Sequence, residues 1–79
     1  MARKTTSPHR SRFEPLYDTH PQTGATFEVF YADTVLALSF GLRGSGWCWW
    51  LCAPGDLPDA PPVGPFATSY AAYRDAMKS

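Results

Sequence analysis

Gly46-Trp47-Cys48-Trp49-Trp50-Leu51-Cys52 is a very apolar segment that holds all three Trp residues and both Cys residues of this 79-residue chain. A short apolar run that follows a Gly-rich stretch predicts a buried β-strand, and its large rings predict the centre of the core. Cys48 and Cys52 lie four residues apart, so a strand would point both to one face about 13 Å from each other. A disulfide requires Cα atoms within roughly 7 Å, so the sequence predicts two free thiols.

The segments before this strand predict further strands joined by short connections. Residues 25–32 are rich in β-branched and aromatic side chains, which predicts a strand. Residues 13–17, where Pro15 marks an edge position, and the apolar run 35–40 are predicted strands as well. Asp33-Thr34 is predicted to form a tight turn, and residues 41–46 a Gly-rich hairpin turn. Connections this short favour an antiparallel meander over parallel crossovers.

The C-terminal third of the chain predicts a loop and then a helix. Residues 53–65 hold five of the eight Pro residues, which predicts an extended loop. Thr68 or Ser69 is predicted to cap a helix, whose apolar face carries Tyr70, Tyr73 and Met77 at positions i, i+3 and i+7. The predicted fold is therefore α+β, an antiparallel three- to four-stranded β-meander with one C-terminal α-helix packed on one face. It forms a single domain over residues 13–79.

Both faces of this predicted sheet are apolar, whereas one helix covers only one face. We expect the helix to cover one set of side chains, namely Val29, Leu36, Leu38, Phe40, Cys48, Trp50 and Cys52. The opposite face then carries Phe30, Val35, Trp47, Trp49 and Leu51. Two explanations for this second face remain open. Either the Pro-rich loop and residues 13–17 fold over it, or it is a surface for a partner or for self-association.

The charges are unevenly distributed although the net charge is zero. The segment 1–12 carries four basic residues and no acid, which predicts a disordered basic arm of charge +4, with a nucleic-acid-contacting tail as the functional alternative. Residues 13–79 carry three bases and seven acids, which leaves a charge of −4. Summed charge of this kind steers association, so this part should attract basic surfaces and repel nucleic acid.

No motif for catalysis or for a cofactor is present. Cys48, Cys52, His9 and His20 could supply four zinc ligands by count, but two Cys within one strand do not have the usual ligand spacing. A Cys–His nucleophile would require the loop that carries His20 to fold across the strand. Residues 41–46 lack the Gly-Lys-Ser/Thr ending of a phosphate-binding loop. We therefore expect no enzymatic activity, no metal and no cofactor.

The sequence also predicts a cytoplasmic location. It contains no apolar run near 20 residues, and its basic N-terminus has no apolar segment behind it, so neither a membrane span nor a secretory signal is expected. Two unpaired thiols suit a reducing cytoplasm.

Three segments carry a resemblance to small proteins of bacteriophages and mobile elements: Gly64-Pro65-Phe66-Ala67-Thr68 before an Ala-rich helix, Glu28-Val29-Phe30-Tyr31-Ala32-Asp33, and Gly46-Trp47-Cys48-Trp49-Trp50. In type, the chain resembles the anti-CRISPR proteins, which are tiny, cytosolic, acidic and without enzymatic motifs. This resemblance implies a protein that binds a CRISPR-Cas effector complex in a bacterial host and blocks target DNA binding. An acidic surface that takes the place of DNA in a basic groove is one way to do so.

The predicted function is therefore non-enzymatic inhibition through a protein–protein contact with an effector subunit that has a basic DNA-binding surface. Charge and exposed aromatic rings nominate the contact residues Glu14, Asp18, Glu28, Asp33, Asp56, Asp59, Trp47 and Trp49. The alternative is a small nucleic-acid-binding accessory protein that uses its basic arm for phosphates and exposed aromatics for stacking. Deleting residues 2–12 distinguishes the two, because only the second function requires the arm.

Overall fold

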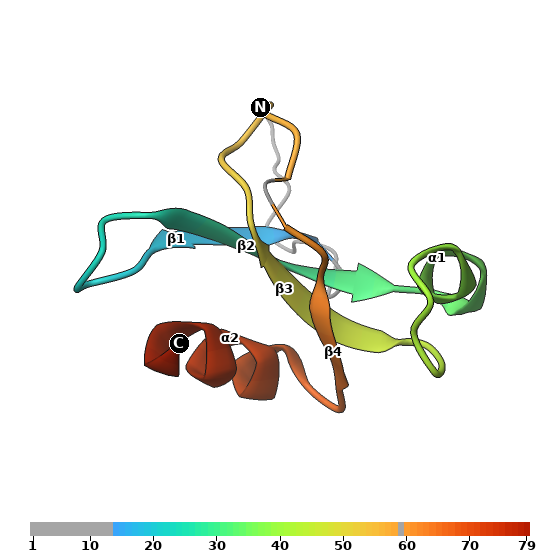
Figure 1. Ribbon diagram of the computed structural model, residues 1–79. Helices are drawn as coiled ribbons and strands as arrows, with labels where there is room; N and C mark the ends of the chain where they lie inside the picture. The colour runs from blue at the N-terminus through green and yellow to red at the C-terminus, as the bar shows by residue number, and fades with distance from the viewer. Residues whose placement is uncertain (1–13, 59) are drawn as a thin grey trace, which may run out of the picture.

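Four strands and two helices make up the part of the chain that the computed structural model describes, residues 14–58 and 60–79 (Figure 1). The elements are β1 (Leu16–Thr19), β2 (Thr26–Ala32), α1 (Thr34–Ser39), β3 (Gly46–Leu51), β4 (Val63–Phe66) and α2 (Ser69–Lys78). The predicted basic arm, Phe13 and Asp59 lie outside the described residues.

The strands form one antiparallel sheet in the order β1-β2-β3-β4. The long central pair, β2 and β3, sets the register, with Val29 opposite Trp49 and Glu28 opposite Trp50. Helix α2 packs against β2, β3 and β4 on one face of this sheet, whereas α1 stands beside the end of β2 (Figure 1). The predicted α+β class, the antiparallel sheet and the C-terminal helix are confirmed.

The prediction of a strand over residues 35–40 is wrong, because this segment is mostly helix α1. Asp33, expected in a tight turn, is the N-cap of α1, and its side chain accepts a hydrogen bond from the backbone N–H of Leu36. Val35 is the only β-branched residue of the run 35–40, and Leu and Ala favour helix over strand. A six-residue apolar run does not distinguish the two by periodicity alone.

The fourth strand instead comes from the segment predicted as a Pro-rich loop. Residues 63–66 form β4, which pairs with β3 through Val63 and Phe66. Gly64 passes close to β3 with a φ of 149°, a conformation that favours glycine over residues with a Cβ atom. Pro65 lacks a backbone N–H donor, and β4 tolerates it because it is an edge strand.

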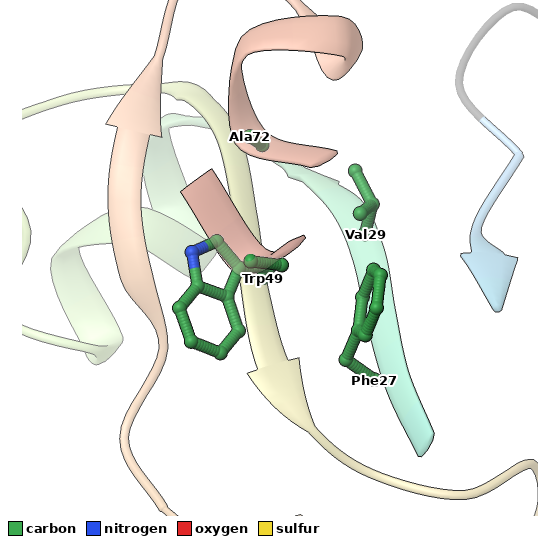
Figure 2. Close-up of a cluster of buried hydrophobic side chains, with 5 residues drawn as sticks. Phe27, Val29, Trp49 and Ala72 are labelled. Carbon is green, nitrogen blue, oxygen red and sulfur yellow. The ribbon is translucent and has the colours of Figure 1, made fainter. Parts of the chain in front are cut away.

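Helix α2 begins as predicted, at an N-cap formed by Thr68. The Thr68 hydroxyl accepts a hydrogen bond of 3.0 Å from the backbone N–H of Ala71. Ala72 and Ala76 are fully buried, and their small side chains let the helix approach the sheet closely. Phe27, Val29 and Trp49 gather beneath them to form the main core (Figure 2).

A second cluster of buried side chains fills the opposite face of the sheet. Its members are Phe30, Ala32, Ala37 and Cys48, against which Phe40, Leu42 and Trp50 pack. The rings of Phe30 and Trp50 are tilted against each other with centroids 4.6 Å apart. Helix α1 and the residues after it therefore cover the sheet face opposite α2. The two explanations offered for this face were a cover formed by the Pro-rich loop and residues 13–17, and a surface for a partner.

The predicted division of side chains between the two faces is correct for Val29 and Phe30 and wrong for β3. Trp49 lies under α2, and Cys48 and Trp50 lie on the opposite face. The reason is the register, since directly opposed residues point to the same side of a sheet and Val29 is opposite Trp49.

Substituting Gly64 tests the close approach of β4 to β3. A Cβ atom at Gly64 would lie 2.8 Å from the Trp47 carbonyl oxygen and 2.9 Å from the Cys48 Sγ. We expect Gly64→Ala to lower the free energy of unfolding by more than about 2 kcal/mol, because the clash and the positive φ add. Urea unfolding followed by Trp fluorescence measures it.

Gly44→Ala is the matched control, because a Cβ atom there has no neighbour within 4 Å. It should change the unfolding free energy by less than about 0.5 kcal/mol. Equal effects of the two substitutions would contradict the packing described for β4.

Candidate functional site

Asp18, one of the nominated contact residues, joins β1 to α2. Its Oδ2 accepts a hydrogen bond of 2.7 Å from the phenol of Tyr73, and its Oδ1 accepts one of 2.7 Å from the backbone N–H of Thr19. The hydrogen bond from Tyr73 and, to a smaller extent, the one from Thr19 lower the pKa of Asp18. The hydrogen bond between Tyr73 and Asp18 also raises the pKa of Tyr73. The Asp18 carboxylate is therefore engaged within the fold.

Asp33 and Asp75 are engaged in the same way. Asp33 lies at the start of α1, where its Oδ1 accepts a hydrogen bond of 2.8 Å from Leu36. Asp75, which the sequence analysis did not nominate, accepts a hydrogen bond of 2.9 Å from the indole N–H of Trp49. Asp75 lies three residues after Ala72, and residues three apart share one face of a helix. This spacing is the sequence signal that places Asp75 near the core that Ala72 contacts.

Glu28 lies on the face opposite α2, in a row across three strands. The register places Tyr17 of β1 and Trp50 of β3 on either side of it. The indole N–H of Trp50 donates a hydrogen bond of 2.8 Å to the Glu28 carboxylate. Burial, followed by the charge of Glu28, raises the pKa of Tyr17. Glu28 thus holds an indole in place and remains half-buried.

The two nominated Trp residues are packed inside the protein to different degrees. Trp49 is 8% exposed, and its ring meets Phe27 edge-on with centroids 6.5 Å apart. The prediction that Trp49 lies on the face opposite the helix is therefore wrong, because Trp49 packs against Ala72 and Ala76 of α2. Trp47 is half-buried, packs against the core beneath α2 and meets the Tyr31 ring edge-on.

The structure does not bring the nominated acids to one place. Asp18 contacts α2 on one face, whereas Glu28 lies on the other face. Asp33 begins α1, and Asp56 lies in the loop after β3. Glu14 precedes β1 and is exposed, and Asp59 lies outside the described residues. Among the described residues, Asp18, Glu28, Asp33 and Asp56 therefore do not form a continuous acidic strip of the kind that replaces a DNA backbone.

Asp56 differs from the other acids. The carboxylates of Asp18, Glu28, Asp33 and Asp75 each accept a hydrogen bond. Within the described part of the chain, the Asp56 carboxylate takes part in no hydrogen bond or ion pair, and the residue is exposed.

Asp56 is one of the residues that line a hollow of about 470 Å³ at one end of the sheet. The hollow lies between the start of β2, the end of β3 and the loop that follows it. Its lining residues are Ala25, Thr26, Leu51, Ala53, Asp56 and Leu57. Leu57 is 87% exposed. A hollow lined by four residues with aliphatic side chains and by one acid whose carboxylate has no hydrogen-bond partner among the described residues is suited to holding an aliphatic chain that ends in a positive charge.

Helix α1 carries a second exposed surface, which is formed by aliphatic side chains. Val35 is 78% exposed and Leu38 is 66% exposed, whereas Ala37 on the other side of the same helix is buried. Neighbouring exposed aliphatic side chains are typical of surfaces that meet other proteins.

Both thiols and His20 have structural roles. Cys48 and Cys52 are buried thiols, and burial raises the pKa of the Cys48 thiol. His20 is 4% exposed. Its Nδ1 accepts hydrogen bonds from Gln22 and Thr23, so its Nε2–H donates to the Ser79 backbone oxygen. Neither ring nitrogen is available to activate a thiol.

Residues 14–58 and 60–79 hold no group of three or more His, Cys, Asp or Glu side chains placed to bind a metal ion. Across the same residues, no helix has the length and the hydropathy needed to cross a membrane.

Two substitutions of Asp33 separate its structural role from its charge. Asp33→Ala removes the acceptor for Leu36 and should lower the free energy of unfolding by about 1 kcal/mol, the usual effect of a lost N-cap. Asp33→Asn keeps an acceptor and removes the charge, so it should cost less than about 0.5 kcal/mol. Urea unfolding of the two variants measures this, and an equal loss in both would contradict the capping role.

Labelling of the thiols tests their burial. Only an accessible thiolate reacts quickly with an aromatic disulfide reagent, so both cysteines should react far more slowly in the native protein than in urea. Mass spectrometry of time points identifies the labelled residue. Fast native labelling of Cys48 or Cys52 would contradict a structural role and favour a thiol enzyme.

No family model, curated protein or solved structure matches this chain.

Proposed function

We propose that this protein is a non-enzymatic inhibitor that acts in the cytoplasm of a bacterial host. It binds a CRISPR-Cas effector complex at a basic surface and thereby prevents the complex from binding target DNA. The observation that carries this proposal is the net negative charge of residues 13–79, which contain seven acidic and three basic residues. Such a domain is drawn to basic protein surfaces, which are the surfaces that bind nucleic acid.

The uncommitted groups of the described residues support a protein rather than a nucleic acid as the partner. Val35, Leu38 and Leu57 are exposed aliphatic side chains, and Asp56 is an exposed acid. Nucleic-acid binding through stacking requires open aromatic faces, whereas Trp49 is buried and Trp50 packs against Phe30 and Phe40. Tyr70 is 66% exposed, but the Arg74 guanidinium lies over its ring.

The scattered positions of the acids favour a particular version of this inhibition. The acids together supply long-range attraction to a basic surface, and short-range contacts come from separate small surfaces. The protein then blocks DNA by covering part of the basic surface, without reproducing the regular spacing of phosphates along a duplex.

A gel-shift assay with purified CRISPR surveillance complexes tests the proposal. Labelled target DNA is mixed with the complex in the presence or absence of this protein, and one lane contains DNA and this protein alone. We expect the complex–DNA band to disappear while free DNA keeps its mobility. The unchanged mobility follows from the negative charge of residues 13–79.

The control is a full-length variant in which the basic residues before Phe13, namely Arg3, Lys4, Arg10 and Arg12, are changed to Gln. It should inhibit as well as the original protein. A shift of DNA alone that this variant loses would favour the nucleic-acid-binding alternative, and an intact complex–DNA band in every lane would contradict the proposal.

A further inference from the structure

We propose that the hollow beside Asp56 binds a single lysine or arginine side chain of the partner protein. The inference rests on the proposed function in one respect, which is that the partner presents a basic protein surface. It goes further by naming the residue that makes the short-range contact and the kind of side chain that this residue receives.

The hollow has the chemistry of such a site. Its lining residues include Ala25, Leu51, Ala53 and Leu57, which carry aliphatic side chains, together with Thr26 and Asp56. Lysine and arginine bury their aliphatic stems against apolar walls while their charged ends seek an acceptor. A carboxylate can meet a guanidinium with two parallel hydrogen bonds, which are among the strong ones in proteins.

The volume of the hollow is adequate for this occupant. At about 470 Å³, it falls in the range of roughly 300–1,000 Å³ found for small-molecule sites, so a single long side chain fits with room for water.

The loop that carries Asp56 is tied to the end of β3. The Cys52 Sγ–H donates to the Asp56 backbone oxygen at 3.3 Å, and the Asp56 N–H donates to the Ala53 carbonyl oxygen at 3.0 Å. In addition, the Cys52 N–H donates to the Thr26 carbonyl oxygen of β2. These bonds fix the backbone on which the carboxylate is carried, so less conformational entropy is lost when a ligand binds.

Charge complementarity distinguishes Asp56 from the other acids. An acid whose carboxylate already accepts a hydrogen bond from an indole, a phenol or a helix N-terminus must give up that bond, or share it, to receive a cation. Asp18, Glu28, Asp33 and Asp75 are in this position, whereas the Asp56 carboxylate has no such bond to lose among the described residues.

An NMR titration of the full-length protein tests the proposal without any effector complex. The probe is a blocked pentapeptide with one arginine between glycines, and the reference probe carries citrulline, the uncharged analogue of arginine, at the same place. We expect the arginine peptide to move the backbone amide signals of Ala25, Thr26, Ala53 and Leu57, and the citrulline peptide to move them much less.

Asp56→Asn should weaken binding of the arginine peptide by about three- to fivefold, the effect of losing one exposed ion pair. Asp33→Asn is the matched control, because it removes the same charge at a distant position and keeps its cap. It should leave the affinity within about a factor of two, because exposed charges farther apart than about 8–10 Å are largely screened.

Equal weakening by the two variants, or equal binding of the two peptides, would overturn the proposal. A second outcome would also overturn it. If, without any peptide, the same four amide signals differed between the original protein and the variant with Gln at the four N-terminal basic positions, the protein's own basic residues would occupy the hollow. Since the titration contains no CRISPR complex, its failure leaves the gel-shift result untouched. If the complex–DNA band persists but the arginine peptide binds as expected, the CRISPR-Cas complex is rejected as the partner and the binding site beside Asp56 is retained.

Discussion

The pairing of β2 with β3 is the constraint on which the rest of this structure depends. Because Val29 lies opposite Trp49, both point to the face that α2 covers. Glu28 and Trp50, one position along, then point to the opposite face. Strands β1 and β4 add to the two sides of this pair, and α2 contacts both of its strands. A shift of the register by one residue would exchange the two faces and leave α2 without its core.

Large rings give this small domain a core, and their polar tips determine where the acids are used. Rings of this kind remove much area from water, but a buried indole or phenol needs a hydrogen-bond partner. Three carboxylates supply it, in the pairs Trp49–Asp75, Trp50–Glu28 and Tyr73–Asp18. A fourth, Asp33, caps α1. Most acids of the described domain therefore stabilise the fold as well as charging the surface, which explains why they lie on both faces.

The sequence was sufficient to predict the features that local chemistry determines. Helix α2 follows from its Thr68 cap and its helical spacing. The antiparallel sheet was predicted from short connections, but in the structure β2 joins β3 through α1, and β3 joins β4 through residues 52–62. The helix at 34–39 was missed because six apolar residues fit either structure, and Asp33 serves as a turn residue or a cap with equal ease. Strand β4 was missed because Gly64 and Pro65 disfavour a strand locally, and only the neighbouring β3 makes it possible. The hollow beside Asp56 depends on the path of a loop, which no local pattern encodes.

The distinction between charge and contact governs what these acids can do for binding. A carboxylate that is hydrogen-bonded to an indole keeps its charge, so it still attracts a basic partner over several ångströms. At short range it is already occupied, and a cation gains less from meeting it. Reversing the charge of Glu28 would therefore disturb both the attraction and the Trp50 side chain that it holds. An uncommitted acid such as Asp56 separates the two effects, because its substitution by Asn alters the charge while leaving the hydrogen bonds of the fold in place.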